Sequence, residues 1–285
     1  MGAHTVILGA KGMLGVELVR VFSDSEVLAW DREQLDITNG EDVVRRIVEA
    51  RPTLIINAAA YNAVDKAEEE PDVANRVNGD AVGYLAKAAE DCGATFVHYS
   101  SDYVFDGEKS DGYREDDTPN PISAYGRSKF LGEQKMQNAE CRMQNYYLIR
   151  TSRLFGKEGG GKKSFVDTML ALAQTKDRLE IVDEEFASPT YAADLAEQTR
   201  KVIDSKQPSG IYHITNSGVC TWYNFAQEIF AQAPHTKVPI VQPVPSSKFP
   251  RPARRPAFSQ LLNTKLPLLR TWQEALRAYL ESIQK

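Results

Sequence analysis

The 285-residue chain has little cysteine, no long apolar run and no excess of positive charge. Its three cysteines, Cys92, Cys141 and Cys220, are far apart and lack a CxxC spacing, which argues against a disulfide framework and a zinc site. The longest apolar runs, such as residues 53–60, are shorter than the ~18 residues that cross a bilayer. A net charge of −5 disfavours nonspecific electrostatic binding to the nucleic-acid backbone. We therefore expect a cytoplasmic protein with no secretory signal and no membrane or nucleic-acid partner.

Short β-rich runs alternate with longer helical patterns through the first half of the chain. The predicted strands are residues 5–8, 26–30, 54–57, 95–100 and 146–150, and the predicted helices are residues 15–22, 41–50, 71–92 and 123–136. This alternation is typical of a parallel sheet with both faces covered by helices. We expect an α/β fold, with a Rossmann-type doubly wound parallel sheet over residues 1–152. Residues 153–285 should form a smaller C-terminal lobe, with some segments returning to the sheet.

A glycine-rich turn, residues 9–15 (GAKGMLG), follows the first predicted strand and opens a helix. Small residues in this position let backbone amides approach a pyrophosphate at the helix N-terminus. Asp31 ends the second strand about 20 residues later, where its carboxylate can bind the ribose hydroxyls of NADH. Lys11 in the turn and Arg32 beside Asp31 could instead neutralise the 2′-phosphate of NADPH. The choice between NADH and NADPH stays open at this point.

Tyr125 and Lys129 are four residues apart in a predicted helix, so both side chains project from one face, one turn apart. A nearby ammonium favours the phenolate, so we expect Lys129 to lower the pKa of Tyr125 and make it a proton donor near neutral pH. Ser101 follows a predicted strand at the carboxyl edge of the sheet, where such folds bind ligands. Its hydroxyl can bind a carbonyl oxygen. The three residues predict acid catalysis at a carbonyl group.

Longer segments carry a resemblance to a known family. They are residues 57–68 (NAAAYNAVDKAE), 98–105 (HYSSDYVF), 150–156 (RTSRLFG), 188–190 (SPT), 210–215 (GIYHIT) and 254–261 (RRPAFSQL). With Ser101, Tyr125 and Lys129, they make the chain similar to the extended short-chain dehydrogenase/reductases, and more specifically to the dTDP-4-dehydrorhamnose reductase family. The resemblance implies an NADPH- or NADH-dependent oxidoreductase that reduces the C4 keto group of dTDP-4-dehydro-L-rhamnose. The product, dTDP-L-rhamnose, would serve cell-surface polysaccharide synthesis.

The same resemblance implies a role for each site residue. Tyr125 would protonate the C4 oxygen, Lys129 would hold the nicotinamide ribose, and Ser101 would bind the keto oxygen. The cofactor would contact Gly9, Gly12, Met13, Leu14 and Gly15 in the turn, Asp31 at the ribose, Asp36 and Ile37 at the adenine, and Ala60, Tyr61, Asn62, Tyr99, Tyr125 and Lys129 around the nicotinamide half. The substrate, bound by the smaller lobe, would contact Ser101, Asp102, Tyr103, Arg153 and Arg255.

Two positions depart from the family pattern. Arg153 stands where a tryptophan is common, and this cation could pair with a phosphate or a carboxylate. Ala187 stands where a glycine usually precedes Ser-Pro-Thr, which matters if the backbone there needs a positive φ. Arg255, in a stiff proline-rich segment, suits a diphosphate. We predict no metal ligand, and a homodimer stays open.

Two alternatives remain. One is another nucleotide-4-keto-sugar reductase or an epimerase of the same superfamily, which Arg153 keeps open. The other is a noncatalytic, cofactor-binding regulatory subunit, because a fold alone does not establish chemistry.

Overall fold

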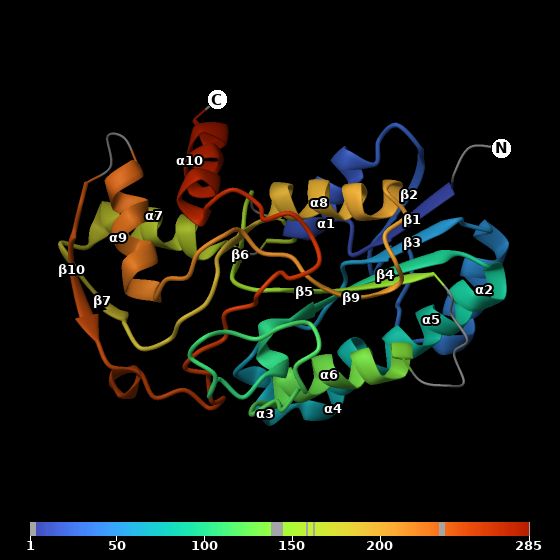
Figure 1. Cartoon of the computed structure of the whole chain (residues 1–285), viewed down its shortest axis with the longest axis horizontal. Helices are drawn as coiled ribbons and strands as arrows, with labels where there is room; N and C mark the ends of the chain where they lie inside the picture. The colour runs from blue at the N-terminus through green and yellow to red at the C-terminus, as the bar shows by residue number, and fades with distance from the viewer. Residues whose placement is uncertain (1–3, 138–144, 158, 162, 234–236, 285) are drawn as a thin grey trace.

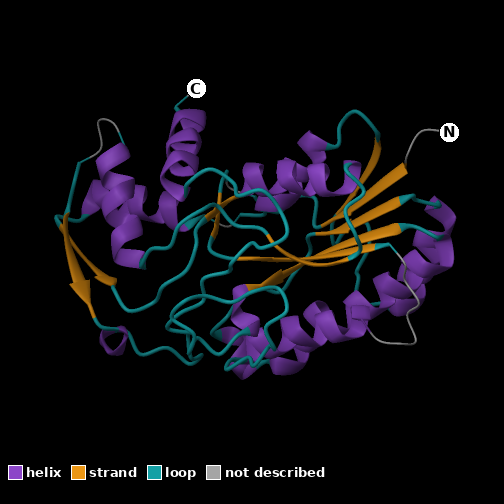
Figure 2. Ribbon diagram, viewed as in Figure 1, coloured by secondary structure: helices purple, strands orange, loops and turns teal. Residues whose placement is uncertain are grey.

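The computed structural model describes residues 4–137, 145–157, 159–161, 163–233 and 237–284, and Cys141 lies outside them. Within these residues, a six-stranded sheet has the order β2-β1-β3-β4-β5-β9, with all neighbours parallel (Figures 1 and 2). The strands are β1 (His4–Leu8), β2 (Glu26–Trp30), β3 (Leu54–Asn57), β4 (Thr95–Ser101), β5 (Tyr146–Thr151) and β9 (Gly210–His213). The order reverses between β1 and β3, and ligands bind beyond the carboxyl ends of the strands at such a point. The expected doubly wound parallel sheet is confirmed.

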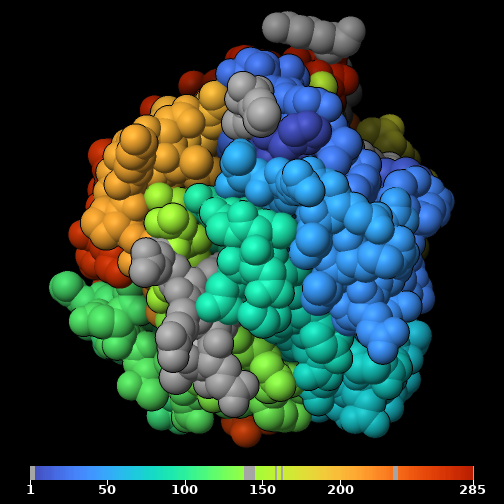
Figure 3. All heavy atoms as spheres, turned by 90° about the vertical axis from the view of Figure 1, so that its right-hand side faces the viewer, coloured from blue at the N-terminus to red at the C-terminus, as the bar shows by residue number. Residues whose placement is uncertain are grey.

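Helices cover both faces of this sheet (Figure 1). One face carries α1 (Met13–Val21) and α8 (Ala192–Asp204), and the other carries α2 (Gly40–Ala50), α5 (Ala81–Cys92) and α6 (Ala124–Gln137). All four residues of β3 are buried, which explains why its sequence, Leu-Ile-Ile-Asn, is nearly continuous in apolar residues. Figure 3 views the molecule from the right-hand side of Figure 1, and on that face α8 (gold) is exposed together with segments of the first half of the chain (blue and teal). Both halves of the chain therefore build the Rossmann lobe.

The predicted helix over residues 71–92 is interrupted. It consists of α4 (Pro71–Asn75), a π-helical turn η1 (Arg76–Asp80) and α5, and it is preceded by the short helix α3 (Lys66–Glu69). Pro71 occupies the first turn, where its missing N–H costs nothing, and Gly93 ends the helix with a φ of 67°. Single π turns inside helices are frequent at functional sites. This one contains Asn78, which contacts Tyr61 and Ser128.

A second core forms the smaller lobe, at the left of Figure 1. It contains α7 (Phe165–Thr175), α9 (Trp222–Gln232), α10 (Trp272–Ile283) and the parallel pair β7 (Arg178–Val182) and β10 (Ile240–Val244). Capping boxes at Ser164, Thr221 and Thr271 begin the three helices. The pair β6 (Leu154–Phe155) and β8 (Thr190–Tyr191) and the short helices η2 (Asp102–Val104) and η3 (Ser246–Lys248) complete the elements. No helix of the described residues is long and apolar enough to span a membrane.

Candidate active site

The structure brings the three predicted catalytic residues together at the carboxyl end of β4. Ser101 is the last residue of that strand, and Tyr125 and Lys129 project from the first two turns of α6. All three are buried: Ser101 is 8% exposed, Tyr125 9% and Lys129 2%. The Tyr125 hydroxyl lies 3.5 Å from the Asn62 side-chain oxygen, in the loop after β3. The predicted grouping of Ser101, Tyr125 and Lys129 therefore has the geometry of one site.

The expectation that Lys129 lowers the pKa of Tyr125 is wrong for this structure. Burial raises the pKa of Tyr125 to about 12, while the Ser101 hydroxyl opposes the rise and the Asp102 charge adds to it. The Lys129 ammonium is directed elsewhere, donating a hydrogen bond of 2.6 Å to the Tyr99 carbonyl oxygen. Spacing along a helix fixed the shared face but not the direction of the flexible lysine side chain. Tyr125 is consequently a protonated phenol at neutral pH.

Lys129 is a buried cation whose pKa burial lowers to about 8, while Glu133 on the same helix opposes the decrease. An ammonium has three donors, and the Tyr99 carbonyl takes one of them. The Tyr99 phenol itself points away, because it shares a 2.8 Å hydrogen bond with Thr199 on α8. Of the predicted nicotinamide contacts, Tyr99 thus meets Lys129 through its main chain.

Asn78, on the π turn, is a site residue that the sequence did not reveal. Its side chain accepts from the Tyr61 amide (2.8 Å) and donates to the Tyr61 carbonyl (2.9 Å) and to Ser128 (3.0 Å). The Tyr61 hydroxyl donates to Glu70 at 2.6 Å. Asn78 therefore fixes the loop of Ala60 and Tyr61 against the helix that carries Tyr125. Periodicity gives no signal for a π turn, so the residue could not be found from the pattern.

Asp102 follows Ser101 and is 3% exposed. Three hydroxyls donate to its carboxylate: Ser101 (2.9 Å) from β4, Ser152 (2.9 Å) after β5, and Ser259 (2.6 Å) in the C-terminal segment. Burial raises the pKa of Asp102, and these hydroxyls oppose the rise. Asp102 thus joins three distant segments behind Ser101, and its direct contact with a sugar stays a prediction.

Tyr103 contacts the predicted catalytic tyrosine and is acted on by charges from both halves of the chain. Its ring meets that of Tyr125 edge to face, with centroids 5.7 Å apart. Burial raises the pKa of the Tyr103 phenol. The charged groups that act on this phenol are Asp102, Arg255, Glu185 and Arg153. The predicted substrate residues from both halves of the chain therefore lie around one phenol next to Tyr125.

Arg153 occupies the left-handed region, with a φ of 43°, and its guanidinium is held on three sides. It donates to the main-chain oxygens of Cys220 (2.8 Å) and Glu185 (2.6 Å) and stacks on Trp222 at 4.1 Å from the ring centroid. Burial lowers its pKa from the ordinary arginine value. Ala187 pairs with Cys220 through two backbone hydrogen bonds and does not have a positive φ, so alanine fits there.

Arg255 forms a two-point ion pair with Asp65, which lies in the loop between β3 and α3. The nitrogen–oxygen distances are 2.8 and 2.7 Å, and the Ala253 amide adds a bond of 3.2 Å to the same carboxylate. This pairing lowers the pKa of Asp65. Four residues earlier, Arg251 pairs with the buried Glu185 carboxylate. The segment of residues 251–255 is therefore bound at Arg255 to the Rossmann lobe and at Arg251 to the smaller lobe.

The glycine turn has the close backbone approach that a dinucleotide site needs. Gly9 has a φ of 72°, and a Cβ there would lie 2.7 Å from the Ala59 amide nitrogen. A Cβ on Gly15 would lie 2.1 Å from the Gly9 carbonyl oxygen. Gly12 begins α1 without a side-chain cap, so the first amides of the helix, at Met13 and Leu14, are not covered by a capping side chain. The turn fits a pyrophosphate group at the N-terminus of α1.

Asp31, at the end of β2, accepts hydrogen bonds from the amides of Lys11 (3.0 Å) and Arg32 (2.8 Å). The Lys11 ammonium pairs with Glu33. Arg32 is the least restrained of these cations, with a side chain 86% exposed and 3.5 Å from Asp36. Thr38 donates to Asp36 through its hydroxyl (2.7 Å) and amide (3.0 Å), which lowers the pKa of Asp36.

Ile37, predicted beside the adenine, is 7% exposed and packs in the core of the Rossmann lobe. The structure therefore places the predicted adenine and ribose residues together along the ends of β2 and the loop before α2.

Comparison with known proteins decides the family. A profile described as the RmlD substrate binding domain matches residues 3–285. The chain belongs to this family. The dTDP-4-dehydrorhamnose reductase of Burkholderia thailandensis is 38% identical over 276 residues, which cover 92% of this chain and 91% of that protein. Spore coat polysaccharide biosynthesis protein SpsK of Bacillus subtilis is 37% identical over 282 residues, which cover 97% of this chain and 96% of that protein.

Solved structures agree with this assignment to the RmlD family. The dTDP-4-dehydrorhamnose reductase of Bacillus anthracis, in complex with NADP, superposes with a TM-score of 0.93 at 36% identity and covers 100% of both chains. UDP-glucose 4-epimerase of Thermus thermophilus, in complex with NAD, superposes at 0.80 with 21% identity over 99% of both chains. The second likeness concerns the fold alone. The resemblance to reductases of dTDP-4-dehydrorhamnose is confirmed.

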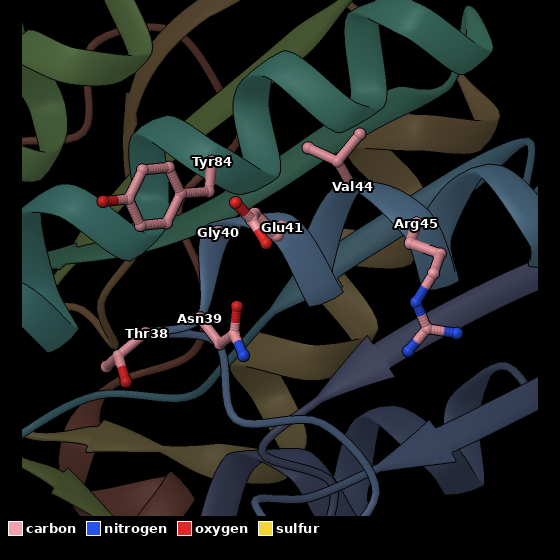
Figure 4. Close-up of a pocket in the computed structure, with 7 residues that line it drawn as sticks. All are labelled: Thr38, Asn39, Gly40, Glu41, Val44, Arg45 and Tyr84. Atoms are coloured by element: carbon pink, nitrogen blue, oxygen red, sulfur yellow. The ribbon is translucent and has the colours of Figure 1, made fainter.

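This RmlD-family chain has one more feature near the predicted adenine residues, an open hollow beside the start of α2 (Figure 4). It is lined by Thr38, Asn39, Gly40, Glu41, Val44, Arg45 and Tyr84. The Tyr84 ring packs so closely on Gly40 that a Cβ there would lie 3.1 Å from it. Asn39 caps α2 by accepting from Asp42. The hollow contains none of the predicted catalytic residues, and we assign it no chemistry.

Proposed function

We propose that this chain reduces the C4 keto group of dTDP-4-dehydro-L-rhamnose to dTDP-L-rhamnose, with NADPH or NADH as the hydride donor. The observation that carries the proposal is the buried set of Ser101, Tyr125 and Lys129 at the carboxyl edge of the sheet, in a chain of the RmlD family. Relatives named dTDP-4-dehydrorhamnose reductase, at 33–39% identity over most of the chain, support it.

Tyr125 supplies the proton. Its phenol is protonated at neutral pH, since burial raises its pKa to about 12, and its neighbour Ser101 can bind the same substrate oxygen. The Ser101 hydroxyl donates to Asp102 in this structure, and a hydroxyl proton can rotate toward another acceptor. As negative charge develops on the C4 oxygen, the acidity difference between phenol and alcohol favours proton transfer from Tyr125. Ser101 stabilises the same charge by a hydrogen bond.

The dinucleotide is held by the glycine turn, Asp31 and Lys129. When bound, the reduced nicotinamide supplies the hydride that C4 receives. No side chain caps the amides at the start of α1, which suits a pyrophosphate. In this structure Gly159 lies against the Met13 amide, so this glycine must move when the pyrophosphate binds there. Lys129 has two donors beyond the one given to Tyr99, which suits the ribose hydroxyls.

Arg255 is our candidate for the diphosphate of the nucleotide-sugar. It is 11% exposed, and the guanidinium donors that Asp65 and Ala253 do not use, on Nε and Nη2, can bind a phosphate. Its ion pair with Asp65 places it near Tyr103 and therefore near Tyr125.

The deciding assay mixes the purified chain with freshly generated dTDP-4-dehydro-L-rhamnose and follows the loss of reduced-nicotinamide absorbance with NADPH and, separately, NADH. NMR identifies the product. We expect oxidation of cofactor and dTDP-L-rhamnose, and Tyr125→Phe should abolish turnover while cofactor affinity is retained. Equal activity in Tyr125→Phe would reject the acid role. A chain that binds both cofactors but oxidises neither with this substrate would support another keto-sugar substrate or a noncatalytic subunit.

A cytoplasmic location and a homodimer are further proposals. The scattered cysteines suit a reducing compartment. Light scattering of the purified chain would test the dimer, for which a molar mass near one chain would be contrary evidence.

A further inference from the structure

A fully buried ion pair joins α6, the helix that carries Tyr125 and Lys129, to strand β5, and it takes no part in the mechanism above. Glu133 is 0% exposed and lies one turn after Lys129 on α6, and Arg150, on β5, is 1% exposed. One carboxylate oxygen of Glu133 accepts from Ser100 Oγ (2.5 Å) and Arg150 Nε (3.0 Å). The other accepts from Arg150 Nη2 (2.7 Å). The pair is therefore bidentate and has a third bond from β4.

These bonds fasten the catalytic helix to the strand that ends in Ser101. Lys129 donates to the main chain of Tyr99, and Glu133 accepts from the side chain of Ser100. Tyr99, Ser100 and Ser101 are consecutive residues of β4. Two successive turns of α6 are thus bonded to the two residues before Ser101. This arrangement sets the position of the helix, and with it the side chains of Tyr125 and Lys129, relative to the Ser101 hydroxyl.

Arg150 also has contacts on the side that faces away from Glu133. Its guanidinium stacks on Phe105 at 5.0 Å, and its Nη1 lies 3.4 Å from both the Glu115 carbonyl oxygen and His213 Nε2. Burial and the Arg150 charge lower the pKa of His213 to about 4, so this imidazole is neutral. The Glu133 carboxylate is therefore the charge that directly balances Arg150. It also lies one helical turn after Lys129 on α6, and its charge favours the Lys129 ammonium.

Stability alone does not explain this pair. Replacing a buried ion pair by apolar side chains of similar volume is often neutral or stabilising. A pair that is bonded to the helix and strand of the catalytic residues, and not to a distant part of the core, can instead act on their geometry and charge.

We propose that Glu133 is a positioning residue: together with Arg150 it holds the catalytic helix against β4 and keeps the Lys129 ammonium bonded to the Tyr99 carbonyl. This inference rests on the proposed reductase function for its catalytic consequence. The effect of Glu133 on the titration midpoint of Lys129 can be measured without turnover.

The charge of Lys129 depends on burial, which lowers its pKa to about 8, and on Glu133, which opposes the decrease. On β4, burial and Lys129 together lower the pKa of His98 well below its ordinary value, so this ring is neutral. The Tyr125 phenol on α6 is also neutral, and Asp102 on η2 is bound by three hydroxyls. Other charged side chains on the helices that pack on α6 have partners of their own or are exposed. The pairs are Glu68 with Arg127, Glu70 with Lys66, Asp80 with Lys135, and Lys87 with Glu90 and Asp91, and the exposed residues are Glu69, Asp72 and Arg76.

The test is Glu133→Gln, which keeps the size of the side chain and its bond to Ser100 but removes the charge. NMR of isotope-labelled lysine side chains follows the titration of Lys129, and the Lys129→Met variant assigns its signal. Losing a negative charge disfavours the ammonium, so the Lys129 midpoint should fall from about 8 by about one pH unit. In the reductase assay, the decline of kcat/KM at high pH should move to lower pH by the same amount.

The matched control is Glu115→Gln. Glu115 is also buried, at 3% exposed, but its carboxylate binds Thr264 and meets Arg150 only through its main chain. Its loss should leave the Lys129 midpoint in place. Equal shifts in both variants, or no shift in Glu133→Gln, would overturn the proposal.

A double variant covers the case in which an unpaired Arg150 prevents folding. Glu133→Gln with Arg150→Met removes both buried charges. The Lys129 midpoint should still fall, but by less than in Glu133→Gln, because the loss of the Arg150 cation offsets part of the loss of Glu133. An unchanged midpoint in this variant would reject the inference. A wild-type chain without reductase activity, in which the Lys129 midpoint still depends on Glu133, would reject the proposed function and leave the role of Glu133 toward Lys129 intact.

Discussion

Arg255 and Asp65 are 190 residues apart in sequence and share two hydrogen bonds, of 2.8 and 2.7 Å, between the proline-rich C-terminal segment and the loop after β3. The guanidinium is 11% exposed and the carboxylate 41%. Solvent reaches the carboxylate and screens part of the attraction, so the pair contributes only modestly to stability. Its larger effect is on direction: it holds a long, flexible cation at one place near Tyr103.

Asp65→Asn should weaken substrate binding more than it weakens the fold. Asparagine has one side-chain oxygen and so accepts only one of the two hydrogen bonds from Arg255, which can then adopt other rotamers. Because Arg255 is less well placed for the diphosphate, KM for the nucleotide-sugar should rise about tenfold. We expect kcat to change little, because Asp65 does not contact Tyr125 or Lys129. Steady-state kinetics with saturating cofactor measure this split.

The control for this change is Asp117→Asn, which removes a carboxylate from a partly exposed ion pair with Lys109. That variant should retain the wild-type KM. A lower kcat with unchanged KM in Asp65→Asn would contradict the positioning of Arg255.

Gly15→Ala should prevent dinucleotide binding and destabilise the Rossmann lobe. A Cβ there would lie 2.1 Å from the Gly9 carbonyl oxygen, which is backbone and cannot move aside cheaply. We expect a loss of about 2–3 kcal/mol, as for overpacked cores, with a distorted glycine turn. Thermal unfolding and cofactor titration by fluorescence measure the two effects.

Gly83→Ala on α5 is the matched helical control. Its Cβ would meet Lys135 side-chain atoms at 3.4 Å, an ordinary contact, and alanine favours helix over glycine. We expect unchanged or slightly higher stability and normal cofactor affinity. Comparable losses in the two variants would show that the turn at Gly15 is not specially constrained.

Most of the fold could be predicted because the signals are local. The strand run at residues 54–57 is apolar because both faces of β3 are buried, and its bounds match the prediction. The helix over residues 71–92 could not be predicted in full. Its π turn serves the contacts of Asn78 with Tyr61 and Ser128, which belong to other parts of the chain. Side-chain periodicity carries no record of such long-range bonds.

The site shows the same division between local and tertiary information. Tyr125 and Lys129 are recognisable because one helical turn joins them. Asp65 and Glu133 are not, since their arginine partners are distant in sequence or on another element. The error in the Tyr125 pKa has the same cause: spacing brought Lys129 onto the right face, but burial, which depends on the whole fold, dominates the pKa of the phenol.

Arg32→Ala should reduce the use of NADPH while leaving NADH nearly unchanged. Arg32 is exposed and bound only weakly, at 3.5 Å from Asp36, so its guanidinium can turn to a 2′-phosphate beside Asp31. We expect KM for NADPH to rise about tenfold and KM for NADH to stay within about twofold. Assays with each cofactor, in parallel with Arg178→Ala in the smaller lobe as the control, measure the ratio. An equal change for both cofactors would exclude Arg32 as the group that discriminates them.

Arg153→Lys should destabilise the smaller lobe although it keeps the charge. The guanidinium donates to two main-chain oxygens, of Cys220 and Glu185, and stacks on Trp222, whereas one ammonium cannot reach both oxygens and remain on the ring. The Cys220 oxygen keeps its bond from the Ala187 amide, but leaving the Glu185 oxygen unbonded costs about 1–3 kcal/mol, which lowers Tm by several degrees. The comparison is Arg200→Lys, a partly exposed arginine that stacks on Phe22 and pairs with carboxylates that water can also reach. The Arg200→Lys variant should lose less than about 1 kcal/mol of stability. A Tm for Arg153→Lys as high as that of Arg200→Lys would mean that the carbonyls bound by Arg153 find other donors.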